Sequence, residues 1–135
     1  MKINMILGIG SDFLNQTRIA EIIHKYGQKF INRIFTEDEK TLAGKYKDPI
    51  AFYAKRFAVK EAAAKALGVG IAQGVSWLDF QTINLNSGQP ILKISRVAEE
   101  ILLTKLPENY KYITHVTITD DKPWVQAFVI IEAVK

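Results

Sequence analysis

Residues 56–70 read RFAVKEAAAKALGVG, and this alanine-rich stretch decides the fold. Alanine is the strongest helix former, so the stretch predicts a helix that stops where the glycines begin. Pro49 suits the first turn of a helix and sets the expected start near Ile50, with the end at Leu67. We therefore expect a long central helix against which the other elements pack.

The same stretch carries an unusual set of charges. Glu61 is its only acid, and the bases around it are Arg56, Lys60 and Lys65. Glu61 and Lys65 have the spacing of an exposed helical ion pair, which contributes about 0.3–0.5 kcal/mol. The alternative is one wall of a site for a polyanion and its metal, with the amides of Gly68–Gly70 near phosphate oxygens. A bare Gly-x-Gly has neither the P-loop lysine nor the third glycine of a dinucleotide-binding motif, so this stretch alone leaves both interpretations open.

Composition places the chain among ordinary globular proteins. Of 135 residues, 48% are hydrophobic and 24% charged, which fits a single domain over residues 1–135. No apolar run approaches the roughly 18 residues that span a bilayer, and Ile3–Ile9 is too short for a signal sequence, so we expect no membrane contact. The absence of cysteine excludes disulfides and thiolate metal sites, and it is compatible with a cytoplasmic location.

The net charge of +4 favours an anionic partner. Nucleic acid, an acidic protein and a phosphorylated small molecule would all suit it. A nucleic-acid-binding surface interleaves aromatic rings with bases, whereas Phe52, Tyr53 and Phe57 have the spacing of helix core. We therefore expect no nucleic-acid binding, and we keep a basic nucleic-acid-binding domain as the lesser alternative.

Hydrophobic spacing and turn residues predict the remaining elements. In chain order they are a strand over 4–10, helices over 15–26 and 36–46, the central helix, a strand over 77–85 that turns through 86–90 into 91–94, a helix over 96–106, and strands over 112–119 and 124–133. Thr36 and Glu39 form a capping box that starts the second helix. The order predicts one α+β domain with an antiparallel sheet, in which the last two strands pair.

Asp12 follows the first expected strand and has two interpretations. The simpler one makes it the cap of the next helix, and the other makes it a functional carboxylate at the strand end. Arg18, Lys29 and Arg33 are equally open, since they fit either a solvated basic face or a docking strip for an acidic partner.

Several separated motifs, taken together, resemble a known family. The first is Gly8-Ile9-Gly10-Ser11-Asp12 followed by Arg18-Ile19, and the second is Arg33-Ile34-Phe35-Thr36 with Glu39. The third is Arg56-Phe57-Ala58-Val59-Lys60-Glu61-Ala62 with Lys65-Ala66 and Gly68-Val69-Gly70. These motifs, with a hairpin at Gly88-Gln89-Pro90 and a last strand that reaches Glu132, resemble the holo-acyl-carrier-protein synthases, the small bacterial class of phosphopantetheinyl transferases. The resemblance covers essentially the whole chain and implies the fold of that family.

The resemblance also implies a reaction. Members of the family transfer the 4′-phosphopantetheine arm of coenzyme A to a serine of apo acyl carrier protein, for fatty acid biosynthesis, and release adenosine 3′,5′-bisphosphate. The motifs imply Asp12 and Glu61 as ligands of Mg²⁺, which prefers hard oxygen donors and shares them with substrate phosphates. Glu61, Lys65 and Asp12 would form the catalytic group, with Glu61 as a candidate base through water and Lys65 near the leaving bisphosphate.

The other implied contacts are with the two substrates and with copies of the chain. Coenzyme A would be held by Arg56, Lys60, Lys65, Gly68 and Gly70. The acidic carrier protein would dock on Arg18, Lys29 and Arg33. The family acts as a homotrimer with coenzyme A held between two subunits, and the apolar strand Phe128-Val129-Ile130-Ile131 needs cover that such an interface would provide.

Two positions depart from the family pattern. Where the family usually has Ser-x-Ser-His before the last strand, this chain has Thr117-Ile118-Thr119-Asp120, and Val69 stands where the family often has threonine. Asp120 would place an anion near a phosphorylated nucleotide, so we assign it no binding role. A non-catalytic family member that acts as a binding subunit is therefore the second alternative, against which the intact Asp12, Glu61 and Lys65 argue.

Overall fold

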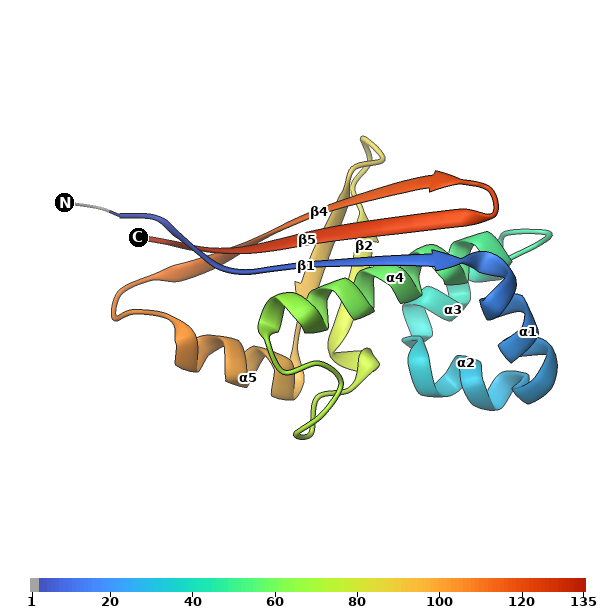
Figure 1. The fold of residues 1–135 in the computed structure, drawn as a ribbon, viewed down its shortest axis with the longest axis horizontal. Coiled ribbons are helices and arrows are strands. Elements are labelled where there is room, and N and C mark those ends of the chain that lie inside the picture. Colours follow the sequence, from blue (N-terminus) through green and yellow to red (C-terminus); the bar gives the residue numbers. More distant parts are fainter. Residues whose placement is uncertain (1–2) are drawn as a thin grey trace.

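The computed structural model describes residues 3–135, so the first two residues of the expected domain lie outside it. A three-stranded antiparallel sheet lies along one long helix (Figure 1). In the sheet, β5 (Trp124–Val134) is flanked by β1 (Met5–Asn15) and by β4 (Lys111–Asp121). The helix is α4 (Ile50–Leu67), whose bounds match the expectation. The α+β fold, with an antiparallel sheet packed against a long central helix, is confirmed.

Two glycines let β1 lie directly on the backbone of α4. A Cβ added to Gly8 would lie 1.7 Å from the carbonyl oxygen of Ala66, and one added to Gly10 would lie 2.0 Å from that of Ala62. Both distances are far below van der Waals contact, so a larger residue would push the strand off the helix. The alanines of α4 complete this close approach, since Ala62 is fully buried. The alanine-rich stretch therefore specifies both a helix and a flat surface for the sheet.

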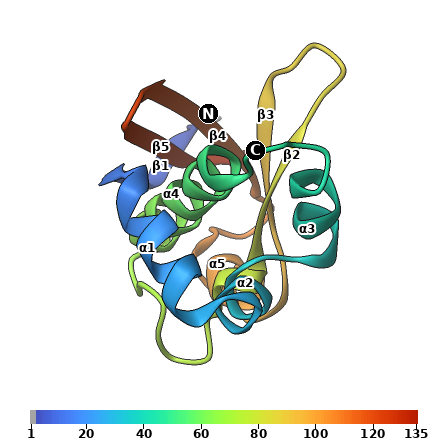
Figure 2. The same cartoon turned by 90° about the vertical axis from the view of Figure 1, so that its right-hand side faces the viewer.

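The other elements surround α4. They are α1 (Gln16–Tyr26), α2 (Gln28–Ile34), α3 (Glu37–Ala43), the short 3-10 helix η1 (Trp77–Asp79), the hairpin of β2 (Phe80–Asn84) and β3 (Pro90–Ile94), and α5 (Arg96–Lys105). Figure 2 shows the β2–β3 hairpin as an arm separate from the three-stranded sheet. Among residues 3–135, none of the helices combines the length and apolarity that a bilayer crossing requires.

Local capping signals proved reliable. The backbone N–H of Thr36 donates to Oε1 of Glu39 at 2.9 Å, and the N–H of Glu39 donates to Oγ1 of Thr36 at 3.2 Å, which confirms the capping box. The central helix ends at Gly68, whose φ of +91° is the left-handed conformation that favours glycine. These short-range signals fix where α3 begins and α4 ends.

Several segments differ from the expectation. β1 continues through Asp12, which pairs with Ala127, so the helix cap is Asn15 and the interpretation of Asp12 as a cap is wrong. β4 likewise continues through Asp120 because β5 pairs with it to the end. Residues 28–34 form α2, which was not expected after the stop at Gly27. The strand expected over 77–85 begins only at Phe80, because residues 77–79 form η1. In the first two cases the partner strand extends an element beyond its local signal.

The sheet face opposite α4 is rich in exposed apolar side chains. Ile9 and Phe13 project from β1, and Trp124 and Phe128 from β5, with exposed fractions between 36% and 61%. The rings of Phe13 and Trp124 stack with centroids 5.0 Å apart. A contiguous apolar surface of this kind is unusual for a protein that works alone.

Candidate active site

Asp12, Glu61 and Lys65 lie together where β1 meets α4. Asp12 is on the same strand face as Gly10, which is pressed against α4. Lys65 Nζ lies 3.4 Å from Oδ1 of Asp12 and donates to the carbonyl of Ser11 at 2.9 Å. Glu61 precedes Lys65 by one helical turn and shares its face of the helix. The structure thus brings Asp12 and Lys65 into contact and places Glu61 one helical turn from Lys65 on the same face of α4.

Glu61 is held by a residue that sequence reasoning did not single out. The indole Nε1 of Trp77, in η1, donates to Oε1 of Glu61 at 2.9 Å. The indole is stacked on Phe57, with centroids 6.4 Å apart and planes 24° apart. Trp77 occupies one carboxylate oxygen and leaves the other to a further partner.

The donor set fits a magnesium ion that is shared with a substrate. Among residues 3–135, no group of three or more histidine, cysteine, aspartate or glutamate side chains is placed to hold a metal. A dedicated protein cage is thus absent from the described part of the chain. Two carboxylates, one from a strand and one from a helix, match the one or two protein ligands that Mg²⁺ takes beside waters and phosphates. Asp12 and Glu61 are the side chains that would hold it.

Lys60 points away from this site, which corrects its expected contact with coenzyme A. Its Nζ lies 2.7 Å from Oε1 of Glu39, and both side chains are 1% exposed. It also donates to the carbonyls of Trp77 at 3.0 Å and Phe80 at 2.5 Å. Burial lowers the pKa of Lys60, and the Glu39 carboxylate counteracts this. Three partners in the interior make Lys60 a structural cation.

The Gly68 and Gly70 amides are also engaged within the protein. The N–H of Gly68 donates to the carbonyls of Ala64 and Lys65, both at 3.1 Å, and the N–H of Gly70 donates to that of Ala64 at 3.3 Å. Nζ of Lys105 donates to the carbonyl of Leu67 at the same helix end. These amides complete the cap of α4, which corrects the expectation that they face phosphate oxygens.

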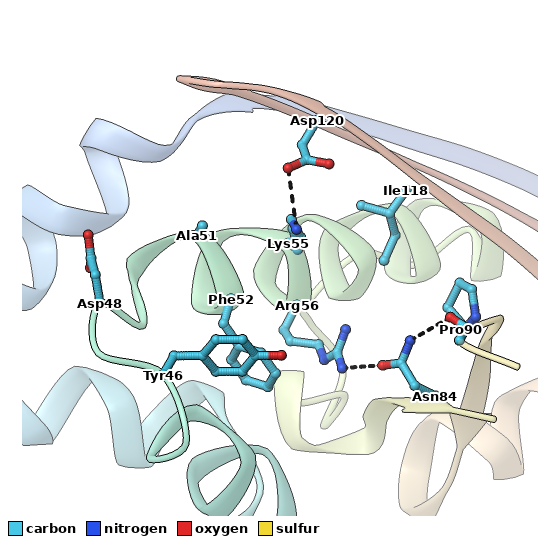
Figure 3. Close-up of a pocket in the computed structure, with 11 residues that line it drawn as sticks. Tyr46, Asp48, Ala51, Phe52, Lys55, Arg56, Asn84, Pro90, Ile118 and Asp120 are labelled. Carbon is cyan, nitrogen blue, oxygen red and sulfur yellow. Dashed lines mark hydrogen bonds and ion pairs between the residues drawn. The ribbon is translucent and has the colours of Figure 1, made fainter. Parts of the chain in front are cut away.

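Arg56 lines a cavity of about 350 Å³ beside the hairpin (Figure 3). Its side chain donates to Oδ1 of Asn84 at 2.5 Å, and its guanidinium lies 4.6 Å from the ring centre of Phe52. Burial lowers the pKa of Arg56, while Glu39 and Tyr46 counteract this effect. Within the described residues, its buried Nε donates no hydrogen bond. A guanidinium in the wall of the cavity is suited to an anionic ligand there.

Asp120 lies at the rim of the same cavity, paired with a cation. Its Oδ2 is 3.3 Å from Nζ of Lys55, and the two side chains are 47% and 34% exposed. Figure 3 shows Asp120 from β4 above Lys55 from α4, with Arg56 and Asn84 deeper in the cavity. The anion that the sequence places here is therefore matched by a lysine that we did not anticipate.

The three expected docking residues are exposed on neighbouring helices. Arg18 is on α1, and Lys29 and Arg33 are one turn apart on α2. The guanidinium of Arg33 lies 5.8 Å from the ring centre of Trp77. This basic surface therefore borders the residue that holds Glu61.

Comparison with known proteins identifies the family. The sequence profile of the 4′-phosphopantetheinyl transferase superfamily matches residues 8–128. The chain belongs to this superfamily. The resemblance inferred from the sequence motifs is confirmed, and the match includes Asp12, Glu61 and Lys65 of the transferase within its range.

Individual relatives cover nearly all of the transferase. A protein of Roseobacter denitrificans named holo-[acyl-carrier-protein] synthase is 49% identical over 129 residues, which is 96% of each chain. The crystal structure of holo-[acyl-carrier-protein] synthase from Neisseria meningitidis has a TM-score of 0.82 and 33% identity, and covers 94% of this chain and 98% of its own. A Bacillus anthracis synthase solved in complex with "CoA (3′,5′-ADP)" has a TM-score of 0.77 and 36% identity, over 95% and 97%.

Proposed function

We propose that this protein is a holo-[acyl-carrier-protein] synthase. It transfers the 4′-phosphopantetheine arm of coenzyme A to a serine hydroxyl of apo acyl carrier protein, and it releases adenosine 3′,5′-bisphosphate, for fatty acid biosynthesis. The observation that carries the proposal is the contact of Asp12 on β1 with Lys65 on α4, one helical turn from Glu61. Its support is a chain that is 49% identical, over nearly its whole length, to a protein of that name.

Each side chain at the β1–α4 contact has a part in the proposed reaction. Asp12 and Glu61 would hold Mg²⁺, which would neutralise diphosphate charge and act as a Lewis acid. The Lys65 ammonium, beside Asp12, stabilises the negative charge that develops on the leaving bisphosphate. Glu61 is also our candidate for the group that accepts the serine proton, through a water molecule.

We assign the cavity at Arg56 to the phosphorylated nucleotide end of coenzyme A. The guanidinium of Arg56 and the ammonium of Lys55 both line this cavity, and both suit phosphate. The Bacillus anthracis relative was solved with "CoA (3′,5′-ADP)", which supports a nucleotide as the ligand class. In this assignment Lys60, Gly68 and Gly70 shape the protein without touching coenzyme A.

Arg18, Lys29 and Arg33 form the proposed docking surface for the acidic carrier protein. All three are exposed on α1 and α2. Charge complementarity of this kind raises the rate of encounter more than it deepens affinity, and it weakens as salt is added. We also propose that the enzyme works in the cytoplasm, which the absence of cysteine permits.

The apolar sheet face supports a homotrimer with active sites between subunits. Ile9, Phe13, Trp124 and Phe128 form a contiguous exposed surface on β1 and β5. Burying apolar area contributes about 25 cal/mol per Å², so a surface of this type favours association. In the proposed trimer these faces cover one another, and each coenzyme A lies between two subunits.

Mass spectrometry of the carrier tests the reaction itself. Apo carrier protein, coenzyme A, Mg²⁺ and this enzyme are mixed, and we expect the carrier to gain the mass of one phosphopantetheine. A related synthase in a parallel reaction is the positive control. A carrier that binds the protein but keeps its apo mass, while the control reaction proceeds, would instead support a non-catalytic binding subunit.

A further inference from the structure

We propose that Trp77 is a positioning residue that holds the Glu61 carboxylate in the orientation required to bind magnesium. This inference rests on the proposed role of Glu61 as a metal ligand. The indole Nε1–H of Trp77 donates to Oε1 of Glu61 at 2.9 Å in a part-buried setting. An indole nitrogen is a donor only, so the contact ties down one carboxylate oxygen and directs the other elsewhere.

The indole ring has two further neighbours, Phe57 and Arg33. Phe57, one helical turn before Glu61, stacks on it with planes 24° apart. The guanidinium of Arg33, from α2, lies 5.8 Å from the ring centre. Because Phe57 and Glu61 belong to the same rigid helix, the ring and the carboxylate that it orients keep a fixed relationship.

The backbone around Trp77 is also fixed by hydrogen bonds. Lys60 Nζ donates to the carbonyl of Trp77 at 3.0 Å. Around it, Oγ of Ser76 accepts from the N–H of Leu78 at 3.1 Å, and Oδ2 of Asp79 accepts from the N–H of Ser76 at 3.3 Å. Lys60 and Glu61 are neighbours in sequence, so one holds the main chain of Trp77 and the other receives its side-chain hydrogen bond. Orienting contacts of this kind are what a metal ligand needs in order to keep a single geometry.

An ordinary structural tryptophan would also find an acceptor for its N–H. A structural role and a positioning role of Trp77 affect different measurable quantities. A structural role changes the free energy of unfolding, whereas a positioning role changes the affinity of the site for Mg²⁺. Loss of a hydrogen bond to a metal ligand typically costs 10–100-fold in metal affinity or activity.

The substitution Trp77→Phe separates the roles, because it keeps a stacked ring and removes the N–H. Transfer to apo carrier protein is measured over a range of Mg²⁺ concentrations. We expect the half-saturating concentration to rise by about tenfold, and the rate deficit to shrink as Mg²⁺ is raised. An unchanged half-saturating concentration would overturn the proposal.

A second readout uses the wild-type protein and needs no turnover. The chain has two tryptophans, Trp77 and Trp124. In ¹⁵N-labelled protein with coenzyme A present, we expect Mg²⁺ to shift the indole N–H resonance of Trp77, assigned by its loss in Trp77→Phe. Trp124, on the opposite face of the sheet, is the internal control. In Glu61→Gln the Trp77 resonance should no longer respond to the metal.

The outcomes distinguish this inference from the function on which it rests. A Trp77 resonance that ignores Mg²⁺, in a protein whose transfer activity saturates with Mg²⁺, would overturn the positioning role and leave the synthase intact. Wild-type protein that shows no transfer at any Mg²⁺ concentration would overturn both the positioning role and the synthase function. If Trp77→Phe does not fold, the wild-type protein is labelled with fluorotryptophan, which gives two fluorine resonances. The resonance that is lost in a folded Trp124→Phe variant belongs to Trp124, so the other belongs to Trp77. A Trp77 resonance that does not respond to Mg²⁺ would again overturn the positioning role.

Discussion

Nζ of Lys60 lies 2.7 Å from Oε1 of Glu39, and each side chain is only 1% exposed. Glu39 also closes the capping box at the start of α3. A single carboxylate therefore links the start of one helix to the middle of α4. Because Lys60 also binds the carbonyl of Trp77, this buried pair supports the segment next to the proposed metal ligand.

Removing one member of this pair should strongly destabilise the protein. In Lys60→Met the Glu39 carboxylate stays buried without its cation, which typically costs about 3–5 kcal/mol. Urea unfolding at a fixed protein concentration measures the change. Lys55→Met, which breaks the partly exposed pair with Asp120, is the matched control and should cost less than about 1 kcal/mol. Equal losses in the two variants would contradict a special role for the buried pair.

Changing the charge at the cavity rim should change the affinity for coenzyme A. In Asp120→His the anion is lost and the Lys55 ammonium is freed, so we expect the KM for coenzyme A to fall by about twofold to fivefold, the size typical of exposed charge pairs. Lys55→Ala should raise it by a similar factor. The KM for the carrier protein serves as the control for both. An unchanged KM for coenzyme A in Asp120→His would mean that the Asp120 carboxylate does not weaken the binding of coenzyme A.

A charge on the apolar sheet face should break the proposed trimer. Phe13 is 61% exposed and stacks on Trp124, so Phe13→Asp would bury a carboxylate in the interface. Light scattering after size-exclusion chromatography should show a trimer for the wild type and a lower mass for this variant. Leu103→Asp replaces a 52% exposed side chain on α5 and should stay trimeric. A monomeric wild-type protein would contradict the assembly.

Charge changes on the docking surface should alter the KM for the carrier protein and leave the KM for coenzyme A unchanged. In the double variant Arg18→Glu and Lys29→Glu, repulsion of the acidic carrier should raise its KM on the order of tenfold at low salt. The KM for coenzyme A should not change, and added salt should narrow the difference. Lys93→Glu, an exposed charge reversal on the β2–β3 hairpin, is the control. Equal effects of Lys93→Glu would show that only net charge matters.

Features encoded by neighbouring residues could be predicted from the sequence. The bounds of α4, the capping box at Thr36 and the hairpin around Gly88 all follow from short-range rules, and the structure confirms them. The strand end at Asp12 could not be predicted this way, because β1 is extended by its pairing with β5. Sheet partners override local turn signals where a ladder can continue.

The sequence predicted which residues to consider for the candidate site better than it predicted where their side chains point. Lys60 and Lys65 were both expected to bind coenzyme A, yet one is buried against Glu39 and the other lies beside Asp12. The burial of Lys60 depends on Glu39, which α3 supplies from elsewhere in the chain. The contact of Trp77 with Glu61 depends on a 3-10 turn that gave no periodic signal.

The most direct test of the account measures transfer by Asp12→Asn and Glu61→Gln over a range of Mg²⁺ concentrations, with mass spectrometry of the carrier as the readout. Both substitutions keep the size of the side chain and remove the charge that would hold the ion. We expect each to lower the rate by more than about 100-fold, since a bound metal contributes several kcal/mol of charge stabilisation, while the midpoint of thermal unfolding changes little. Wild-type rates with ordinary Mg²⁺ dependence in either variant would contradict the assignment of Asp12 and Glu61 as the metal-binding pair.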